Sequence, residues 1–230
     1  MNYKKTILKL LHQSLPSFLY KKNAYSQDGE DMVIASFYEG IKNYKGFYID
    51  IGAHHPYRFS NTAYFYNKGW KGINIEPTPD LFKPFLKYRK KNINLNVGIG
   101  NGEKMTFYVF NEGALNTFDK DLAYSRNNDK SNNYKIIESI EIQTETIAEI
   151  CEKYINPNQI IDFMTIDVEG LDFEVLKTNN WAKYIPKFIL IECDLSISEI
   201  HNDPIFSYLI EKGYEMVART KRTSIFRIAS

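Results

Sequence analysis

The sequence predicts an α/β fold built on a mainly parallel sheet, and two observations support this. Short apolar runs rich in β-branched and aromatic residues alternate with segments of helical pattern, which is typical of parallel strands joined by helices. The end of the chain differs, because residues 214–220 and 223–229 flank a Lys221-Arg222 turn and should pair as an antiparallel hairpin. We therefore expect a seven-stranded sheet, whose five parallel strands are residues 47–51, 72–75, 93–97, 160–166 and 188–191.

The length and composition indicate an ordinary globular protein with one large domain. The chain has 230 residues, and its 29 Lys and Arg nearly balance its 28 Asp and Glu, which gives a net charge of +1. This overall charge predicts no general affinity for nucleic acid or for an anionic membrane. Two cysteines, Cys151 and Cys193, lack the spacing of a zinc site and are expected to be reduced thiols of a cytoplasmic protein.

An amphipathic helix is expected over residues 1–24, ahead of the main domain at residues 25–230. Polar residues interrupt its apolar stripe too early for a signal peptide or a membrane-spanning segment. Packing on the domain, or on a second subunit in a homo-oligomer, is favoured over a membrane-surface anchor, because the segment is short and has a single basic cluster. The stripe consists of Ile7, Leu8, Leu10, Leu11 and Leu15.

A small β insertion is expected between the third and fourth parallel strands. Residues 104–110 and 135–143 have the pattern of two additional strands. The segment between them, residues 119–133, is rich in Asn, Asp, Ser and Lys. It is interpreted as a solvated loop in preference to a mobile lid, since it shows no periodicity.

The first parallel strand leads directly into a turn that is typical of nucleotide-type cofactor sites. An acid and a glycine, Asp50 and Gly52, stand at the end of this apolar strand. The next strand ends in Glu76, 26 residues after Asp50, where a carboxylate can accept hydrogen bonds from both hydroxyls of a ribose. A plain tight turn is the structural alternative.

The same turn lacks the features of a phosphate site. The second and third glycines of the dinucleotide pattern G-x-G-x-x-G are missing, and no Walker-type loop is present. A nicotinamide-dependent oxidoreductase is therefore disfavoured. A cofactor with a ribose and an adenine but no phosphate fits better, and S-adenosylmethionine meets that description.

Six sequence blocks together resemble the FkbM family of methyltransferases, over about Tyr25 to Asp194. The resemblance implies a Rossmann-like class I methyltransferase fold, S-adenosylmethionine as cofactor, and methyl transfer, usually to a hydroxyl of a sugar or another natural-product scaffold. It does not fix the acceptor. The blocks are YSQDGED (25–31), GFYIDIGAHHP (46–56), FSNT (59–62), GWKGINIEP (69–77), NVGIG (96–100) and IDVEG (166–170).

The resemblance and the strand ends together predict the residues that hold the cofactor. Asp50 and Gly52 would form the turn under the methionine part, and Glu76 would hold the ribose. Asn96 ends the third strand, where the adenine is expected.

Two triplets are predicted at the amino acid end of the cofactor. The first belongs to the opening motif, although helix capping explains much of the same segment. The second begins the helix after the first strand, where free amides suit a carboxylate and a plain N-cap is the alternative. The triplets are Ser26, Gln27 and Glu30, and Ser60, Asn61 and Thr62.

The candidate catalytic groups follow the fourth strand and the first turn. Asp167 can orient an acceptor, accept its proton or bind a divalent cation, and Glu169 follows it, with a helix-terminal charge as its structural alternative. His54 is a candidate base, or a hydrogen-bonding strut in the turn. Glu192, which ends the fifth strand, would join Asp167 in a metal site, although no diagnostic ligand spacing is present.

The sequence therefore predicts a cytoplasmic S-adenosylmethionine-dependent O-methyltransferase that acts on a hydroxyl of a sugar, in a nucleotide-linked or surface-glycan precursor. N-methylation of a small amine uses the same cofactor half and stays open. Two further hypotheses compete with methyl transfer: the nicotinamide-dependent oxidoreductase, and a non-catalytic module that binds a partner through its N-terminal helix.

Overall fold

The computed structural model describes residues 3–15, 21–193 and 195–229, and it confirms the predicted α/β fold. Seven strands form one sheet in the order β3-β2-β1-β7-β8-β10-β9. Neighbouring strands are parallel except at β10, which is antiparallel to β8 and β9. The strands are β1 (Phe47–Ile51), β2 (Lys71–Ile75), β3 (Ile93–Leu95), β7 (Phe163–Ile166), β8 (Phe188–Glu192), β9 (Tyr214–Arg219) and β10 (Thr223–Ile228).

Helices cover both faces of this sheet, and the alternation of side chains along each strand divides the core between them. In β1, Ile49 and Ile51 pack with buried residues of α7, α8 and α9, whereas Tyr48 packs with those of α3 and α4. Helix α5 lies beside β3, and the short helix η2 precedes α9. The helices are α3 (Glu30–Phe37), α4 (Ala63–Asn67), α5 (Pro79–Tyr88), α7 (Ile147–Tyr154), α8 (Asp172–Lys177), η2 (Ile200–Asn202) and α9 (Pro204–Glu211).

The predicted β insertion forms a second sheet in the order β4-β6-β5, but the solvated loop expected inside it is wrong. Helix α6 occupies that segment, and Asp119 caps it by accepting a hydrogen bond from the Leu122 N–H at 3.0 Å. The helix buries only Ala123, so the sequence has no amphipathic periodicity there. The elements are β4 (Gly98–Ile99), β5 (Lys104–Phe110), η1 (Gly113–Leu115), α6 (Lys120–Asn128) and β6 (Ile136–Glu145).

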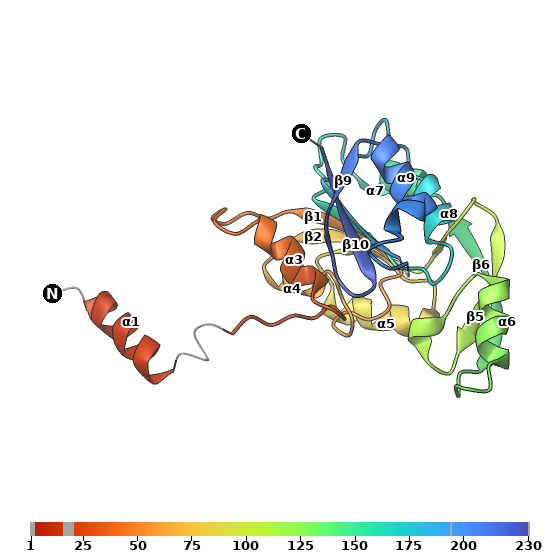
Figure 1. Cartoon of the computed structure of the whole chain (residues 1–230), viewed down its shortest axis with the longest axis horizontal. Coiled ribbons are helices and arrows are strands. Elements are labelled where there is room, and N and C mark those ends of the chain that lie inside the picture. The colour runs from red at the N-terminus through yellow and green to blue at the C-terminus, as the bar shows by residue number, and fades with distance from the viewer. Residues whose placement is uncertain (1–2, 16–20, 194, 230) are drawn as a thin grey trace.

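Helix α1 (Tyr3–Ser14) lies apart from the domain (Figure 1). Of the expected helix 1–24, residues 1–2 and 16–20 lie outside the described residues, and residues 21–24 are not helical. The apolar side chains of Ile7 and Leu10 are each 57% exposed, so the domain does not cover them. Within the described residues, no helix has the length and apolar character needed to cross a membrane.

Candidate functional site

The turn after β1 requires a glycine. Gly52 has a φ of +78°, and a Cβ at this position would lie 1.7 Å from the backbone oxygen of Asp167. The amides of Gly52 and Ala53 both donate to the carbonyl of Ile75, at 3.1 and 3.0 Å. The turn is therefore held between the ends of β2 and β7, at the carboxyl edge of the sheet, where α/β folds bind their ligands.

Glu76 lies just beyond β2, and two backbone amides fix its carboxylate. Oε1 accepts from the Thr78 N–H at 2.7 Å and Oε2 accepts from the His54 N–H at 2.8 Å. The side chain is buried, and burial raises its pKa to about 7. A carboxylate has about four acceptor positions, so these two bonds leave capacity for a diol such as a ribose.

Asp50, by contrast, belongs to a buried network beneath the turn. Its Oδ2 accepts from the Thr62 hydroxyl at 2.6 Å, and burial raises its pKa to about 6. The fully buried Arg89 donates to the Ser60 hydroxyl at 3.1 Å and to the Thr62 carbonyl at 3.3 Å. Asp50, Ser60 and Thr62 are outside the set of residues that line the pockets, so the structure places them as supports of the turn.

A pocket with about 760 Å³ of empty space, partly open to solvent, extends from the turn beneath the insertion. Its lining includes Gly52, His54 and Glu76 together with Asp167 and Glu169. The remaining wall is largely apolar, which suits a flat heteroaromatic ring. Its apolar members are Ile51, Phe59, Ile75, Pro77, Val97, Ile99, Phe107, Ala114, Phe118 and Val168.

The insertion contributes Asn116, which the sequence analysis did not single out as a site residue. Its Nδ2 donates to the Thr78 hydroxyl at 3.0 Å, and its Oδ1 accepts from the Phe110 N–H at 2.8 Å. It lines the pocket and is buried. Because Thr78 also donates to Glu76, Asn116 connects the insertion to the carboxylate expected to hold the ribose.

Three carboxylates converge at the ends of β7 and β8. One oxygen from each of Asp167, Glu169 and Glu192 lies within 4.8 Å of the others. Solvent reaches Asp167 through the pockets, yet the surrounding protein removes much of its hydration. This desolvation, followed by the charges of Glu192 and Glu169, raises the pKa of Asp167 well above its ordinary value. Oxygen ligands at this spacing fit a hard divalent cation such as Mg²⁺ or Ca²⁺.

The insertion also fixes the turn that carries Glu169. This residue has a φ of +57°, its carbonyl accepts from the Thr117 hydroxyl at 2.6 Å, and its Oε2 pairs with Nη2 of Arg126 at 2.5 Å. Arg126 lies on α6, so this helix holds one of the three carboxylates in place.

A second, smaller pocket of about 290 Å³ adjoins the first and shares Gln27, Phe59 and Asp167 with it. Its lining is polar except for Phe59, and it includes four carboxylates and one arginine. The other residues that line it are Asp28, Glu30, Asn61, Glu192, Arg222 and Thr223.

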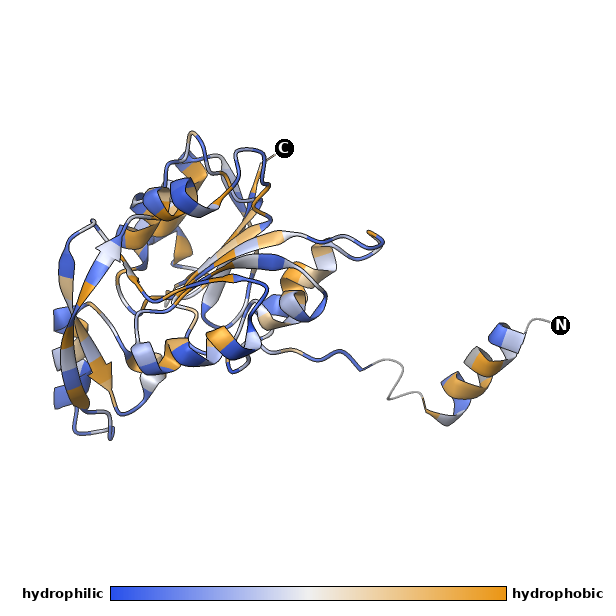
Figure 2. Cartoon of the chain, turned by 180° about the vertical axis from the view of Figure 1, so that it is seen from behind, coloured by the Kyte–Doolittle hydropathy of each residue, from blue (hydrophilic) through white to orange (hydrophobic). Residues whose placement is uncertain are grey.

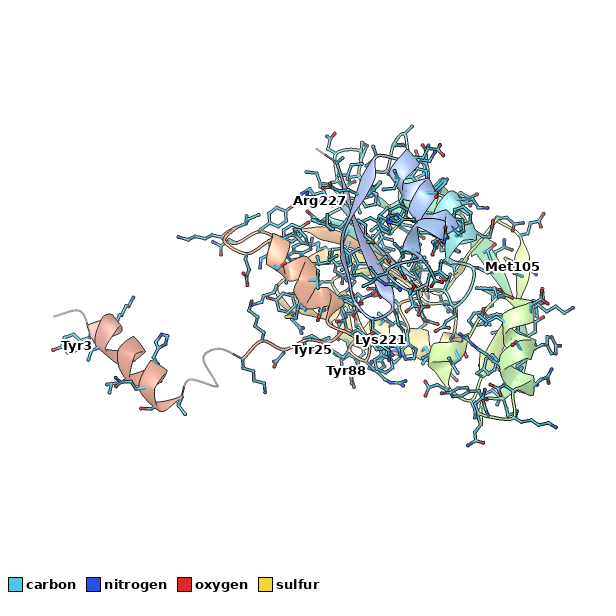
Figure 3. The ribbon with its side chains drawn as sticks, viewed as in Figure 1. Tyr3, Tyr25, Tyr88, Met105, Lys221 and Arg227 are labelled. Atoms are coloured by element: carbon cyan, nitrogen blue, oxygen red, sulfur yellow. The ribbon has the colours of Figure 1, made fainter. Side chains whose placement is uncertain are left out.

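The opening motif borders this second pocket. Ser26 donates to Asp31 at 2.7 Å and accepts from the N–H groups of Gly29 and Asp31, so it supports the start of α3, although Gly29 is the N-cap residue. Glu30 accepts from the Thr220 hydroxyl at 2.5 Å, so the motif is held against the β9–β10 turn. Tyr25 and Lys221, labelled in Figure 3, mark these two segments.

The remaining predicted residues lie at the margins of the site. Asn61 lines the second pocket and donates to the Thr165 hydroxyl at 2.9 Å. Asn96 is exposed, lies outside the set that lines the first pocket, and donates to the carbonyls of Glu76 and Pro77 at 2.8 and 2.9 Å. It therefore positions the backbone after β2.

His54 lines the first pocket with a strained backbone, since its φ is +51°. Burial and then the charge of Arg58 lower its pKa to about 4, so the ring is neutral at pH 7. Its Nδ1 is buried and has no hydrogen-bond partner among the described residues, whereas Nε2 lies 3.3 Å from Nη1 of Arg58. The structure places His54 as a neutral polar group at the pocket wall.

The sheet order and this site define a Rossmann-like class I methyltransferase domain. The family described as Methyltransferase FkbM domain matches residues 50–216, well over half of the chain. The chain belongs to the FkbM family of S-adenosylmethionine-dependent methyltransferases. No protein matched in a comparison with curated sequences.

Solved structures resemble this chain in fold at low sequence identity. Methyltransferase FkbM from Methylobacillus flagellatus KT is 13% identical to this chain, with a TM-score of 0.50. The match covers 88% of this chain and 48% of that protein, so this chain spans about half the length of that protein. M. capricolum TrmK, solved with S-adenosyl-homocysteine, is 12% identical with a TM-score of 0.43, over 89% of this chain and 68% of that one. A Burkholderia thailandensis 1,6-didemethyltoxoflavin-N1-methyltransferase, solved with 1,6-didemethyltoxoflavin and S-adenosylhomocysteine, is 8% identical with a TM-score of 0.43, over 99% and 90%.

Proposed function

We propose that this protein transfers the methyl group of S-adenosylmethionine to a hydroxyl of a sugar, in a nucleotide-linked or surface-glycan precursor. The observation that carries the proposal is the pair of adjoining pockets. The first has apolar walls and the Glu76 carboxylate, and the second is polar. Asp167 belongs to both, so a donor in one and an acceptor in the other would meet beside its carboxylate.

The first pocket fits the cofactor on three grounds. Gly52 leaves the backbone open at the turn, Glu76 offers acceptor positions for the ribose hydroxyls, and the apolar wall suits adenine. Gln27 lines both pockets, so it can contact the amino acid end. When bound, S-adenosylmethionine supplies an activated methyl group on a positively charged sulfonium.

The residues of this chain would align the acceptor and receive its proton. Asp167 would accept the proton that the acceptor hydroxyl loses on methylation, and the cofactor would supply the methyl group and leave as the neutral thioether S-adenosylhomocysteine. Glu169 and Glu192 would orient the acceptor, or share a divalent cation with Asp167 that makes the hydroxyl more acidic. Neutral His54 would contribute a hydrogen bond.

One observation favours a second acceptor class. Four carboxylates line the second pocket against the single Arg222, and such a surface also suits a small amine. An N-methyltransferase is therefore the alternative.

The free, buried Cys151 and Cys193 agree with the proposed cytoplasmic location.

The test combines binding and turnover. Calorimetry with S-adenosylhomocysteine should show saturable binding to the wild type, and labelled S-adenosylmethionine should transfer its label to members of a nucleotide-sugar panel. Asp167→Asn should retain binding but lose transfer by about 100-fold or more. The exposed Glu138→Gln is the matched control and should change neither. Transfer only to amines would favour the alternative, and binding without transfer to any acceptor would favour a non-catalytic module.

A further inference from the structure

Charge is distributed unevenly along the chain, although the net charge is only +1. The first 27 residues contain five lysines and no Asp or Glu, whereas the rest of the chain has 24 Lys and Arg against 28 Asp and Glu. The N-terminal segment is therefore strongly basic and the domain is mildly acidic. A basic segment of this kind complements an anionic surface.

The same segment carries an exposed apolar stripe. On α1, Tyr3, Ile7, Leu10 and Leu11 follow helical spacing, so they share one face, and 76%, 57%, 57% and 36% of each side chain is exposed. Figure 2 shows the hydrophobic colour on this helix, which lies apart from the domain. A stripe of this size on a helix with basic residues is typical of helices that lie in a membrane interface.

We propose that α1 lies on an anionic lipid bilayer, with its apolar stripe inserted among the headgroups and the N-terminal lysines at headgroup level. A second copy of the chain would cover the apolar stripe of α1 less favourably. Two α1 helices have no acidic residue between them, so packing their stripes together would bring lysines close without any opposite charge. A bilayer with anionic headgroups would bury the apolar stripe and would also supply negative charge for the lysines.

Bilayer attachment would position the pockets, a consequence that rests on the proposed function. Ser14 ends α1, and Gln27 lines both pockets. The chain between these two residues can extend at most about 45 Å. A bilayer-bound α1 therefore keeps the pocket rim within that distance of the surface, where an acceptor carried by a lipid would be accessible.

The test is vesicle flotation with the full chain. Vesicles with about 30% phosphatidylglycerol should bind the protein at least about 10-fold more tightly than pure phosphatidylcholine vesicles, and high salt should weaken the binding. Lys4→Gln should weaken it on the order of five-fold. Leu10→Ser should weaken it further by removing part of the stripe. Ile137→Ser, which changes an apolar side chain on β6 that is 65% exposed, is the matched control and should bind like the wild type.

Equal binding of wild type and Leu10→Ser, or no preference for anionic vesicles, would overturn the proposal. So would light scattering that shows a dimer which Leu10→Ser dissociates, together with no vesicle binding, because α1 would then be a subunit interface. Calorimetry with S-adenosylhomocysteine on the same samples separates this outcome from failure of the proposed function, since no residue of α1 lines either pocket.

Discussion

Gly52 lies directly against the backbone carbonyl of Asp167, so that a Cβ at Gly52 would fall 1.7 Å from that oxygen. The contact joins the ends of β1 and β7, which are parallel neighbours in the sheet. Asp167 borders both pockets. The position of the proposed base therefore depends on the absence of a side chain at Gly52.

Gly52→Ala should destabilise the fold and abolish cofactor binding. Gly102→Ala is the matched control, because Gly102 also has a positive φ, +90°, but nothing lies within 4 Å of its Cβ position. The free energy of unfolding of the control should fall by about 1–2 kcal/mol, which is the cost of a left-handed backbone conformation for a residue with a Cβ. The free energy of unfolding of Gly52→Ala should fall by more. Denaturant unfolding and calorimetry with S-adenosylhomocysteine measure both effects. Equal losses of stability in the two variants would contradict the importance of the contact.

The pKa of Glu76 predicts that cofactor binding depends on pH. Burial raises this pKa to about 7, and only the carboxylate form offers all of its lone pairs to a diol. The affinity for S-adenosylhomocysteine should therefore fall as the pH decreases from about 8 to about 6. Glu76→Gln should bind weakly with little dependence on pH in this interval. A flat pH profile of the wild type, measured by calorimetry, would remove Glu76 from the ribose site.

Glu76 also predicts how the free energy of unfolding of the cofactor-free protein depends on pH, and this dependence has the opposite sign. The folded pKa of Glu76, about 7, lies above the ordinary value of 4.5, so the folded state binds more protons between these values. The contribution of Glu76 to the free energy of unfolding is then favourable below pH 4.5 and is lost as the pH rises through 7. Against Glu76→Gln, the wild type should lose up to a few kcal/mol of relative stability across this interval in denaturant titrations.

The sequence was sufficient to predict the sheet. It was not sufficient to predict the direction in which each acidic side chain at a strand end points. Asp50 and Glu76 both follow apolar runs, yet only Glu76 reaches the pocket. In β1, Ile51 lines the pocket, and alternation along the strand places Asp50 on the other face, under Thr62. Glu76 lies one residue beyond β2, where the backbone has turned and alternation no longer decides the direction.

The contribution of the insertion had no local signal in the sequence. Asn116 reaches Thr78 across 38 residues, and Arg126 reaches Glu169 across 43. Helix α6 buries only Ala123 and is held by its N-cap Asp119 and by the contacts of Arg126, so the apolar periodicity on which sequence prediction relies is missing. Contacts between distant segments of one chain leave no pattern in either segment alone.

The convergence of Asp167, Glu169 and Glu192 predicts a response to divalent cations. Mg²⁺ or Ca²⁺ at millimolar concentration should raise the midpoint of thermal unfolding of the wild type, because a bound cation stabilises the folded state. Glu192→Gln should reduce this response, and Glu138→Gln, which changes an exposed acid, should not. If divalent cations shifted the midpoint of thermal unfolding equally in all three proteins, the carboxylates would not bind the metal, and Asp167 would act without one.

Arg126 predicts that the insertion controls the order of the turn at Glu169. Its pair with Glu169 is partly buried, with 24% and 20% of the two side chains exposed, and it also donates to the Leu115 carbonyl at 3.2 Å. Arg126→Gln should therefore lower the free energy of unfolding by about 1–3 kcal/mol. It should also speed amide exchange in residues 115–126 and 168–171, because both segments lose the connection.

The matched control is Arg227→Gln, whose pair with Glu215 is 45% and 50% exposed on the hairpin. Exposed pairs contribute little, so this variant should change stability by less than about 1 kcal/mol and leave exchange near Glu169 unchanged. If both variants gave the same exchange pattern, the turn would be ordered without α6. If only Arg126→Gln loosens the turn, methyl transfer should fall more than S-adenosylhomocysteine binding, because Glu169 is one of the three converging carboxylates proposed to orient the acceptor, whereas the amides of Thr78 and His54 fix Glu76.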